Sequence, residues 1–304
     1  MSEQNASPQA PGGTTTLAGR PVARIGFGAM QLSGPGRPTP PPRERSLAVL
    51  RRAIEAGVNH IDTAQYYGVG LANELIRTAL HPYPDDLVLV SKVGADRLDS
   101  GLRPAQRPEE LRAGVEANLA ALGVERLDVV NLRLMEAQQD GSPLPEEQRV
   151  DLDSQLAEMA ALRDEGKIGG VGVSNVTLEQ LRQALPVGLA CVQNPYSLLD
   201  RSGEPLLELC REHGIAWVPY FPLGSAFPGF AKVTDHPEVV AAAASLGATP
   251  AQVGLAWLLD RYEHALLIPG TSSPDHLDEN IATAQVRLSP ELTRSLDALA
   301  APGR

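Results

Sequence analysis

A regular alternation of short apolar runs with longer amphipathic segments limits the fold of this chain more than any other feature. Each apolar run has the length of a buried strand, and each amphipathic segment has the apolar spacing of a helix. Strands are predicted at residues 25–28, 58–62, 87–92, 127–134, 169–174, 190–193, 215–220 and 265–268. Helices are predicted at residues 43–56, 71–80, 108–122, 154–165, 178–184, 205–213, 237–246, 250–262, from 275 onward and at 290–299. Eight strands that alternate with helices, without a break in composition, predict one (β/α)8 TIM barrel over residues 14–304.

The remaining segments are predicted to be loops, a hairpin and a tail. Residues 14–17 and 22–24 form a short N-terminal β-hairpin that covers the closed end of the barrel. Residues 1–13 carry neither a basic n-region nor an apolar stretch, which predicts a flexible tail and no signal peptide. Three loops, at 31–42, 136–153 and 225–235, are rich in polar residues, glycine or proline. Because such loops vary most, we expect them to select the substrate.

Composition excludes several classes of partner. The chain has 304 residues, a net charge of −11 and no apolar run near membrane-spanning length. An acidic chain lacks the basic field that nucleic acids require, so we expect neither a nucleic-acid nor a membrane partner. Cys191 and Cys210 fall in a predicted strand and a predicted helix, which favours buried reduced thiols and a cytoplasmic location. The scattered histidines show no ligand spacing, so no metal is proposed, and we expect a monomer or a weak homo-oligomer.

Two consecutive strand ends carry side chains suited to proton transfer. The strand at 58–62 ends in Asp62, the next loop presents Tyr67, and the strand at 87–92 ends in Lys92. In a barrel these ends converge on one face, where the active sites of this fold lie. An ammonium beside the phenol would lower its pKa, by at most about three units for a charge ~4 Å away at an effective dielectric of about 20. A phenol tuned in this way is a general acid, and Asp62 would hold the ammonium in place.

Each of these residues also has a plainer interpretation. Asp62 could be a turn residue after a strand, and Lys92 could end its strand at the surface. Only three of the 26 basic residues are lysines, however, and an arginine cannot replace a tunable amine. His60 lies two residues before Asp62 in the strand, so we expect it in the core, and we expect Tyr66 to be packing or pocket wall.

The set Asp62, Tyr67 and Lys92 on consecutive strand ends resembles the aldo-keto reductases. The resemblance extends from about residue 14 to residue 300 and rests on motifs whose order and spacing are specific together. These motifs are Gly26-Phe27-Gly28-Ala29-Met30, Val173-Ser174-Asn175, Gln193-Asn194, Tyr220-Phe221-Pro222-Leu223-Gly224, Ile268-Pro269-Gly270-Thr271 and Glu279-Asn280. The phrase Val129-Val130-Asn131-Leu132-Arg133-Leu134 is similar to the branch that contains bacterial pyridoxal reductases.

The resemblance implies NADPH as cofactor, with NADH possible, and a set of residues that bind it. Ser174, Asn175 and Gln193 would bind the nicotinamide carboxamide, Tyr220 would stack on the ring, and Phe221 to Ser225 would wrap the pyrophosphate with backbone amides. The remaining positions implied are Gly28, Met30, Asp62, Pro222, Leu223, Gly224, Ile268, Gly270, Thr271, Ser272, His276, Glu279 and Asn280. Each of the polar residues could also be an ordinary polar side chain at a strand end that does not bind the cofactor.

The adenosine end departs from members that strongly select the 2′-phosphate. Those members usually carry a lysine after Ile-Pro and an arginine six residues later, whereas this chain has Gly270 and His276. Thr271, Ser272 and the N-terminus of the helix near 275 still offer hydrogen-bond donors. We therefore expect NADPH to be bound with a weakened cationic contact.

A second departure is Arg133. In most of the family, the strand that ends here delivers a histidine that orients the substrate carbonyl. A guanidinium can also donate hydrogen bonds to a developing alkoxide, and it cannot become an acceptor. Arg133 could therefore act on the carbonyl, bind an anionic or phenolate group of the substrate, or pair with a loop carboxylate.

Together these residues predict an NAD(P)H-dependent reductase that converts a small aldehyde or ketone to an alcohol. Tyr67 would protonate the oxygen, and the resemblance makes pyridoxal to pyridoxine the leading reaction. Two alternatives stay open at this point: a natural-product tailoring carbonyl reductase and a cofactor-bound regulatory subunit. The presence of Asp62, Tyr67 and Lys92 together argues against the regulatory subunit.

Overall fold

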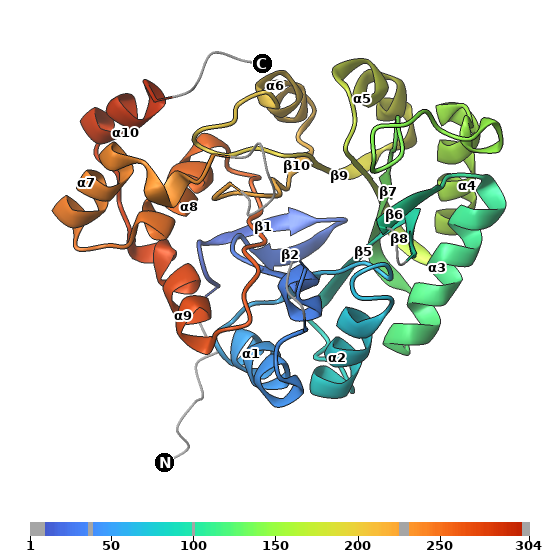
Figure 1. The fold of residues 1–304 in the computed structure, drawn as a ribbon, viewed down its shortest axis with the longest axis horizontal. Helices are drawn as coiled ribbons and strands as arrows, with labels where there is room; N and C mark the ends of the chain where they lie inside the picture. The colour runs from blue at the N-terminus through green and yellow to red at the C-terminus, as the bar shows by residue number, and fades with distance from the viewer. Residues whose placement is uncertain (1–9, 36–38, 99–100, 225–230, 300–304) are drawn as a thin grey trace.

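The computed structural model describes residues 10–35, 39–98, 101–224 and 231–299. A central ring of strands lies inside an outer ring of helices, as the predicted alternation requires (Figure 1). The strands of the ring pair in parallel in the order β10-β9-β8-β7-β5-β4-β3. Their bounds are β3 (Phe27–Gly28), β4 (His60–Asp62), β5 (Val88–Leu98), β7 (Leu127–Arg133), β8 (Ile168–Ser174), β9 (Leu189–Gln193) and β10 (Ala216–Trp217).

The ring closes through single bridges where an eighth strand was predicted at 265–268. Ala265 forms a parallel bridge with Trp217, and Leu267 forms one with Ile25. The Leu266 amide donates to the Trp217 carbonyl, and the Gly26 amide donates to the Leu267 carbonyl, both at 2.8 Å. This segment therefore pairs with one neighbour on each side. The predicted (β/α)8 barrel is therefore confirmed, although its last two strands are shorter than expected.

The helices follow the prediction closely. Their bounds are α1 (Arg43–Glu55), α2 (Leu71–Leu80), α3 (Pro108–Leu122), α4 (Leu152–Asp164), α5 (Leu178–Ala184), α6 (Glu204–His213), α7 (Pro237–Leu246), α8 (Pro250–Arg261), α9 (Pro274–Ala282) and α10 (Pro290–Asp297). Short 3-10 turns are η1 (Ala29–Ser33), η2 (Glu146–Gln148), η3 (Leu185–Val187), η4 (Val233–Asp235) and η5 (Thr283–Gln285). Helix α4 begins two residues earlier than predicted because the Asp151 carboxylate caps it, accepting from the Ser154 amide at 2.8 Å.

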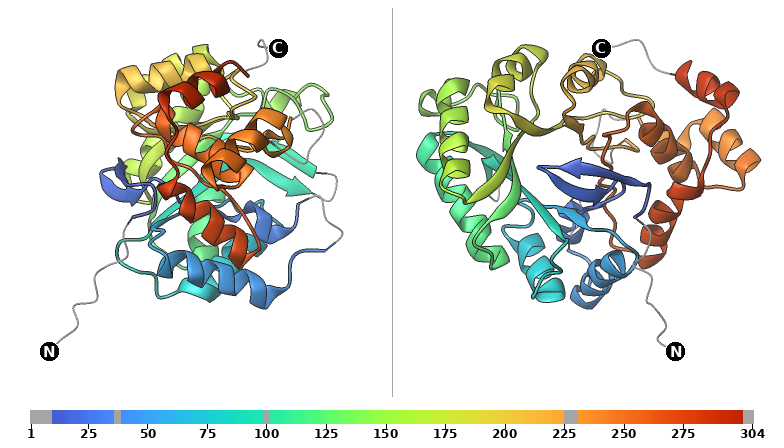
Figure 2. Two further views of the ribbon diagram at one scale, coloured as in Figure 1. Left: turned by 90° about the vertical axis from the view of Figure 1, so that its left-hand side faces the viewer. Right: turned by 180° about the vertical axis from the view of Figure 1, so that it is seen from behind.

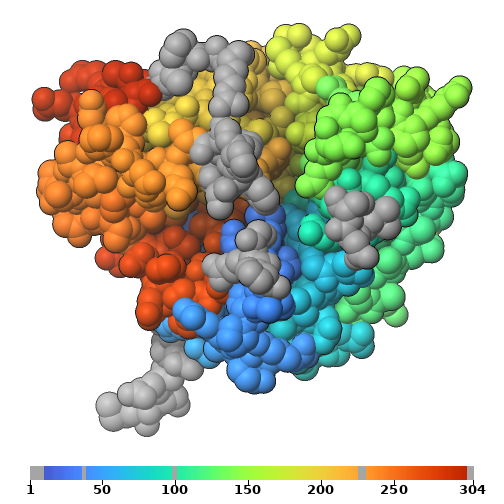
Figure 3. Space-filling view, in the orientation of Figure 1, coloured from blue at the N-terminus to red at the C-terminus, as the bar shows by residue number. Residues whose placement is uncertain are grey.

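The chain travels around the barrel in sequence order, so that neighbouring helices in the sequence are neighbours on the surface. The space-filling view shows this progression from blue at α1 through green at α4 to red at α9 and α10 (Figure 3). In the described part of the chain no single helix is long and apolar enough to cross a membrane, and α7 with α8 reaches that length only as a pair bent by 91°.

The predicted N-terminal hairpin is present as β1 (Thr14–Leu17) and β2 (Arg20–Ala23), which pair antiparallel. Leu17 and Val22 pack into the barrel interior, so the hairpin closes that end. The segment before this hairpin is also hydrogen-bonded to the fold, because the Ile25 amide donates to the Pro11 carbonyl at 3.0 Å. Residues 10–13 of the predicted tail are thus part of the fold, and residues 1–9 lie outside the described residues.

A second hairpin was missed by the sequence reasoning. Strand β5 was predicted to end at Lys92, but it continues to Leu98 and pairs antiparallel with β6 (Gly101–Ala105). Gly94 permits this continuation, because a Cβ there would lie 2.2 Å from the Arg133 carbonyl oxygen. The two hairpins lie at opposite ends of the barrel (Figure 2). The β5–β6 hairpin therefore rises from the end where the parallel strands finish.

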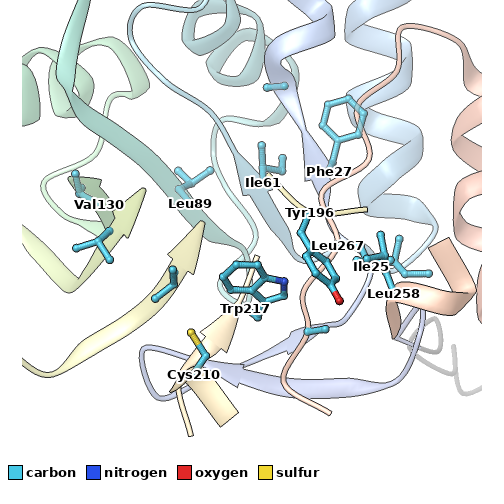
Figure 4. Packing of buried hydrophobic residues seen from close by; sticks show 14 of the residues in the cluster. Ile25, Phe27, Ile61, Leu89, Val130, Tyr196, Cys210, Trp217, Leu258 and Leu267 are labelled. Carbon is cyan, nitrogen blue, oxygen red and sulfur yellow. The ribbon is translucent and has the colours of Figure 1, made fainter. Parts of the chain in front are cut away.

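Strand alternation divides the apolar residues into two clusters. Leu89, Ile61 and Trp217 belong to the cluster between the strands and the helices (Figure 4). Val88 and Val90 belong to the inner cluster, with alternate residues of the other strands. Because successive side chains of a strand point to opposite faces, Lys92 follows Val88 and Val90 to the inside. The same rule places polar side chains from several strands inside the open end of the barrel.

Candidate active site

Lys92 and Asp62 form a buried ion pair at the ends of β5 and β4. The Lys92 ammonium donates to Asp62 Oδ1 and, at 3.0 Å, to the Thr63 carbonyl oxygen. Only 5% of Lys92 and 3% of Asp62 is exposed, so the two charges compensate each other away from water. The other Asp62 oxygen, Oδ2, accepts from Gln193 Nε2 at 2.9 Å. Both carboxylate oxygens are therefore held, and the ammonium has one fixed position.

Tyr67 lies beside this ion pair. The Lys92 Nζ atom is 5.0 Å from the centroid of the Tyr67 ring, and the Tyr66 ring meets Tyr67 edge-on at 5.3 Å. Burial raises the pKa of Tyr67 well above its ordinary value, the Asp62 charge raises it further, and Arg133 opposes the shift. The net lowering of this pKa that we expected is therefore wrong for this structure. The reason is that burial and the Asp62 charge both disfavour the phenolate and outweigh the opposing charge of Arg133.

The raised pKa gives a testable pH dependence. A proton donor must be protonated, and a group whose pKa is raised stays protonated until the pH is high. We expect the rate of carbonyl reduction to stay level between about pH 7 and pH 9, whereas alcohol oxidation, which needs the phenolate as base, should rise through the same range. Stopped-flow rates of both directions would test this. A reduction rate that falls with a midpoint near neutrality would contradict it.

A buried network of hydrogen bonds holds the two strand ends from behind. Asn118 Oδ1 accepts from Ser91 at 2.6 Å and from Asn73 Nδ2 at 2.9 Å, and Asn73 Oδ1 accepts from Thr63 at 2.8 Å. Thr63 and Ser91 are the sequence neighbours of Asp62 and Lys92, so α2 and α3 fix both through one set of bonds. The sequence analysis did not predict this network, although the asparagines on the apolar faces of α2 and α3 could have indicated buried hydrogen bonds.

His60 is buried in the barrel, as expected for a core residue. Burial lowers the pKa of its imidazole to about 4, so the ring is neutral at physiological pH. The ring packs against Gly26, where a Cβ would come within 2.2 Å of it. His60 thus packs below the Asp62–Lys92 pair and does not reach the open face.

The residues expected at the nicotinamide end come together on neighbouring strands. Ser174 of β8 is in register with Gln193 of β9, and the Tyr220 hydroxyl contacts Asn175 Oδ1 at 3.3 Å. Asn175 has a left-handed backbone with φ of 59°, and its Nδ2 donates to the Leu134 carbonyl at 2.8 Å. The amide of Asn175 is therefore already engaged within the protein. Gln193 differs, because its Oε1 is buried and has no partner among the described residues.

Two glycines of the expected cofactor-binding set are required by the packing of the protein itself. A Cβ on Gly28 would lie 2.4 Å from the Ile268 carbonyl oxygen, and one on Gly270 would lie 2.5 Å from the Gly28 carbonyl oxygen. Gly28, Ile268 and Gly270 are thus packed together where the barrel closes. Gly224 is similar, because its φ is 80° and a Cβ would lie 2.0 Å from the Ala231 carbonyl oxygen.

The segment after Tyr220 forms a tight turn. Phe221 has a φ of 53°, and its carbonyl accepts from the Gly224 amide at 2.9 Å. Pro222 lies within this turn. The Leu223 carbonyl accepts from the Val233 amide at 3.1 Å, and this bond connects the turn to η4. Ser225, the last residue expected to wrap the pyrophosphate, lies outside the described residues.

The residues expected at the adenosine end surround the start of α9. Thr271 is buried and its hydroxyl accepts from the Ser273 amide at 3.0 Å, whereas His276 in the first turn of α9 is exposed. The other positions differ in exposure: Asn280 is buried, Ser272 and Met30 are half-buried, and Glu279 is exposed. The structure therefore leaves the His276 imidazole accessible to a ligand at the helix N-terminus.

Arg133 ends β7 and lines a cavity of about 390 Å³. Its Nη1 is buried and has no hydrogen-bond partner among the described residues. Glu136, the loop carboxylate on the same cavity, accepts from Gln180 Nε2 at 3.1 Å. Since none of the ion pairs in the described ranges includes Arg133, pairing with a loop carboxylate does not occur there.

A buried Asp–Lys pair thus lies beside a tyrosine at the open end of the barrel. The model of the aldo/keto reductase family matches residues 24–301. The chain belongs to this family. It is therefore an oxidoreductase that acts on small carbonyl compounds, and the predicted family resemblance is confirmed.

Individual relatives cover nearly the whole chain. Pyridoxine 4-dehydrogenase of Escherichia coli (strain K12) is 44% identical over 94% of this chain and 98% of its own length. Probable aldo-keto reductase 1 of Glycine max is 31% identical over 90% of this chain and 84% of its own length. An aldo/keto reductase from Klebsiella pneumoniae, solved in complex with NADP and acetate, superposes with a TM-score of 0.75 at 27% identity, covering 96% of this chain and 95% of that one.

Proposed function

We propose that this aldo/keto reductase reduces pyridoxal to pyridoxine with NADPH as the reductant. The observation that carries the proposal is the buried Asp62–Lys92 pair beside Tyr67, combined with 44% identity to pyridoxine 4-dehydrogenase over 94% of the chain. Arg133 Nη1, which is buried without a partner among the described residues, also supports a substrate with an ionisable hydroxyl.

The residues present fit a nicotinamide cofactor. The buried, unpartnered Gln193 Oε1 can accept a hydrogen bond from a carboxamide, while Gln193 Nε2 keeps Asp62 in place. Ser174 lies next to it on β8, and the Tyr220 ring stands at the rim of the same face. When bound, the reduced nicotinamide supplies a hydride to the carbonyl carbon. Glutamine, serine and tyrosine would hold and orient it.

The protein's own part in the reaction is to supply a proton and stabilise charge. Tyr67 is neutral at physiological pH because its pKa is raised, so it can donate its hydroxyl proton to the carbonyl oxygen. Lys92, fixed by Asp62 and the Thr63 carbonyl, lies near the ring and stabilises the phenolate left behind. Arg133 donates hydrogen bonds to the oxygen as negative charge builds there.

We propose NADPH with a modest preference over NADH. His276 is exposed in the first turn of α9, where the helix N-terminus also favours an anion. Its neighbours Thr271 and Ser272 carry hydroxyls but no fixed positive charge. We therefore propose that the imidazole of His276, these hydroxyls and the helix N-terminus together contact a 2′-phosphate.

One assay tests the substrate and the cofactor together. Consumption of NADPH and of NADH should be measured with pyridoxal. We expect pyridoxal to be reduced with both, with a modest preference for NADPH. Reduction of other aromatic or cyclic carbonyls without reduction of pyridoxal would instead identify a tailoring reductase. A strong preference for NADPH would show that groups other than His276 hold the phosphate.

The remaining parts of the proposal concern the setting of the enzyme. Cys191 and Cys210 are buried free thiols, which supports a cytoplasmic location. A small carbonyl compound is the partner proposed, and a monomer or a weak homo-oligomer stays a prediction.

A further inference from the structure

We propose that Arg133 determines specificity by binding two substrate oxygens at once, so that the enzyme favours aldehydes with a hydroxyl on the ring carbon next to the aldehyde-bearing carbon. This inference rests on the proposed function, because pyridoxal is such an aldehyde. The guanidinium would donate one hydrogen bond to the carbonyl oxygen and a parallel one to the ionised hydroxyl oxygen.

The direction of Arg133 follows from the alternation of β7. Val129 packs in the inner apolar cluster, and Asn131 lines the small interior cavity together with Asp62 and Gln193. Arg133 is the next residue on the same side of the strand. Lys92 is in register with Asn131, so Arg133 stands one layer closer to the open end than the Asp62–Lys92 pair.

The guanidinium is available for a ligand. Its Nη1 is buried without a partner in the part of the chain described, and the nearby Glu136 is engaged by Gln180. Burial raises the pKa of Tyr67 and of Tyr220, and the charge of Arg133 opposes both increases, which places it within electrostatic reach of both phenols. The adjoining cavity of about 390 Å³ falls within the size range of small-molecule sites, roughly 300–1,000 Å³.

The chemistry of a guanidinium suits two oxygens on neighbouring carbons. Its two terminal nitrogens form a rigid planar fork that binds paired anionic oxygens with two parallel hydrogen bonds. An imidazole at the same position presents one N–H toward the substrate and can serve one oxygen. Replacement of histidine by arginine at this strand end therefore adds a second donor, and the arginine keeps its charge throughout the reaction.

The test compares 2-hydroxybenzaldehyde with 4-hydroxybenzaldehyde, which differ only in the position of the hydroxyl. The ratio of their kcat/KM values is measured in the wild type, in Arg133→His, in Arg133→Lys and in the control Arg182→His, whose arginine is exposed on α5. Intrinsic reactivity cancels when these ratios are compared between proteins. We expect the preference for the 2-hydroxy compound to fall about tenfold or more in both Arg133 variants, since a hydrogen bond to a charged oxygen is lost, and to persist in the control.

A measurement on the wild type alone covers the case in which the variants do not fold. Pyridoxal is compared with its methyl ether at the ring hydroxyl, which cannot ionise, and the ether should show a kcat/KM about tenfold lower. A ratio that stays within about twofold of wild type in folded Arg133→His, or an ether reduced as well as pyridoxal, overturns the inference. If pyridoxal is not reduced but the 2-hydroxy preference and its dependence on Arg133 are present, the proposed substrate fails and this inference stands.

Discussion

Substitution of Tyr67 by phenylalanine should lower the turnover of carbonyl reduction by about 10²–10⁴-fold, the usual contribution of a general acid. The phenol stands beside the Asp62–Lys92 pair and is kept protonated by burial, so removal of its hydroxyl takes away the proton source. The affinity for NADPH should change little, because the hydroxyl acts on the substrate. Single-turnover rates and a fluorescence titration of NADPH would measure the two effects separately.

Tyr66 offers a matched control for this variant. It is the adjacent tyrosine, only 6% exposed, and its ring meets Tyr67 edge-on. Tyr66→Phe removes a phenolic hydroxyl from the same loop without removing the proposed donor, so it should keep most of the wild-type turnover. If Tyr67→Phe retained more than about a tenth of the wild-type turnover, another group would have to donate the proton.

Replacement of Arg133 by methionine should lower the turnover of a neutral aldehyde such as 4-nitrobenzaldehyde by roughly 10²-fold, comparable to loss of one oxyanion donor. Methionine keeps much of the length and the apolar stem of arginine and removes every donor. The change in KM should be smaller, because the lost hydrogen bond strengthens only as charge builds on the oxygen. Steady-state kinetics with both the neutral aldehyde and pyridoxal would separate kcat from KM.

The two substrates distinguish the possible roles of Arg133. A higher KM for pyridoxal with unchanged turnover of the neutral aldehyde would mean that the guanidinium binds only the ionised hydroxyl and not the carbonyl. Arg182→Met, which removes an exposed arginine from α5, should leave both substrates unaffected. Equal activity of Arg133→Met and wild type on both would limit Arg133 to a structural role.

The sequence by itself determined the architecture and the pairing of the candidate catalytic groups. Apolar runs of strand length between amphipathic helices can bury their surfaces in few ways, and a barrel of parallel strands brings all strand ends to one face. The alternation of side chains along each strand then put Lys92 and Asp62 on the inner side with Val88 and Val90. Both consequences follow from local patterns, so the strand ends at 62 and 92 were sufficient to predict the ion pair.

The tertiary structure alone decided the features that depend on neighbours distant in the sequence. The pKa of Tyr67 is raised because burial and the Asp62 charge outweigh the positive charge of Arg133, a balance that no spacing of residues reveals. The continuation of β5 into a hairpin depends on the close approach of Gly94 to the Arg133 carbonyl. For Arg133, the fold removes one of three possible roles, because Glu136 contacts Gln180 and Arg133 Nη1 has no partner among the residues that the structure describes. Sequence patterns thus fixed which groups meet, whereas burial and competing partners, which exist only after folding, set their charge and availability.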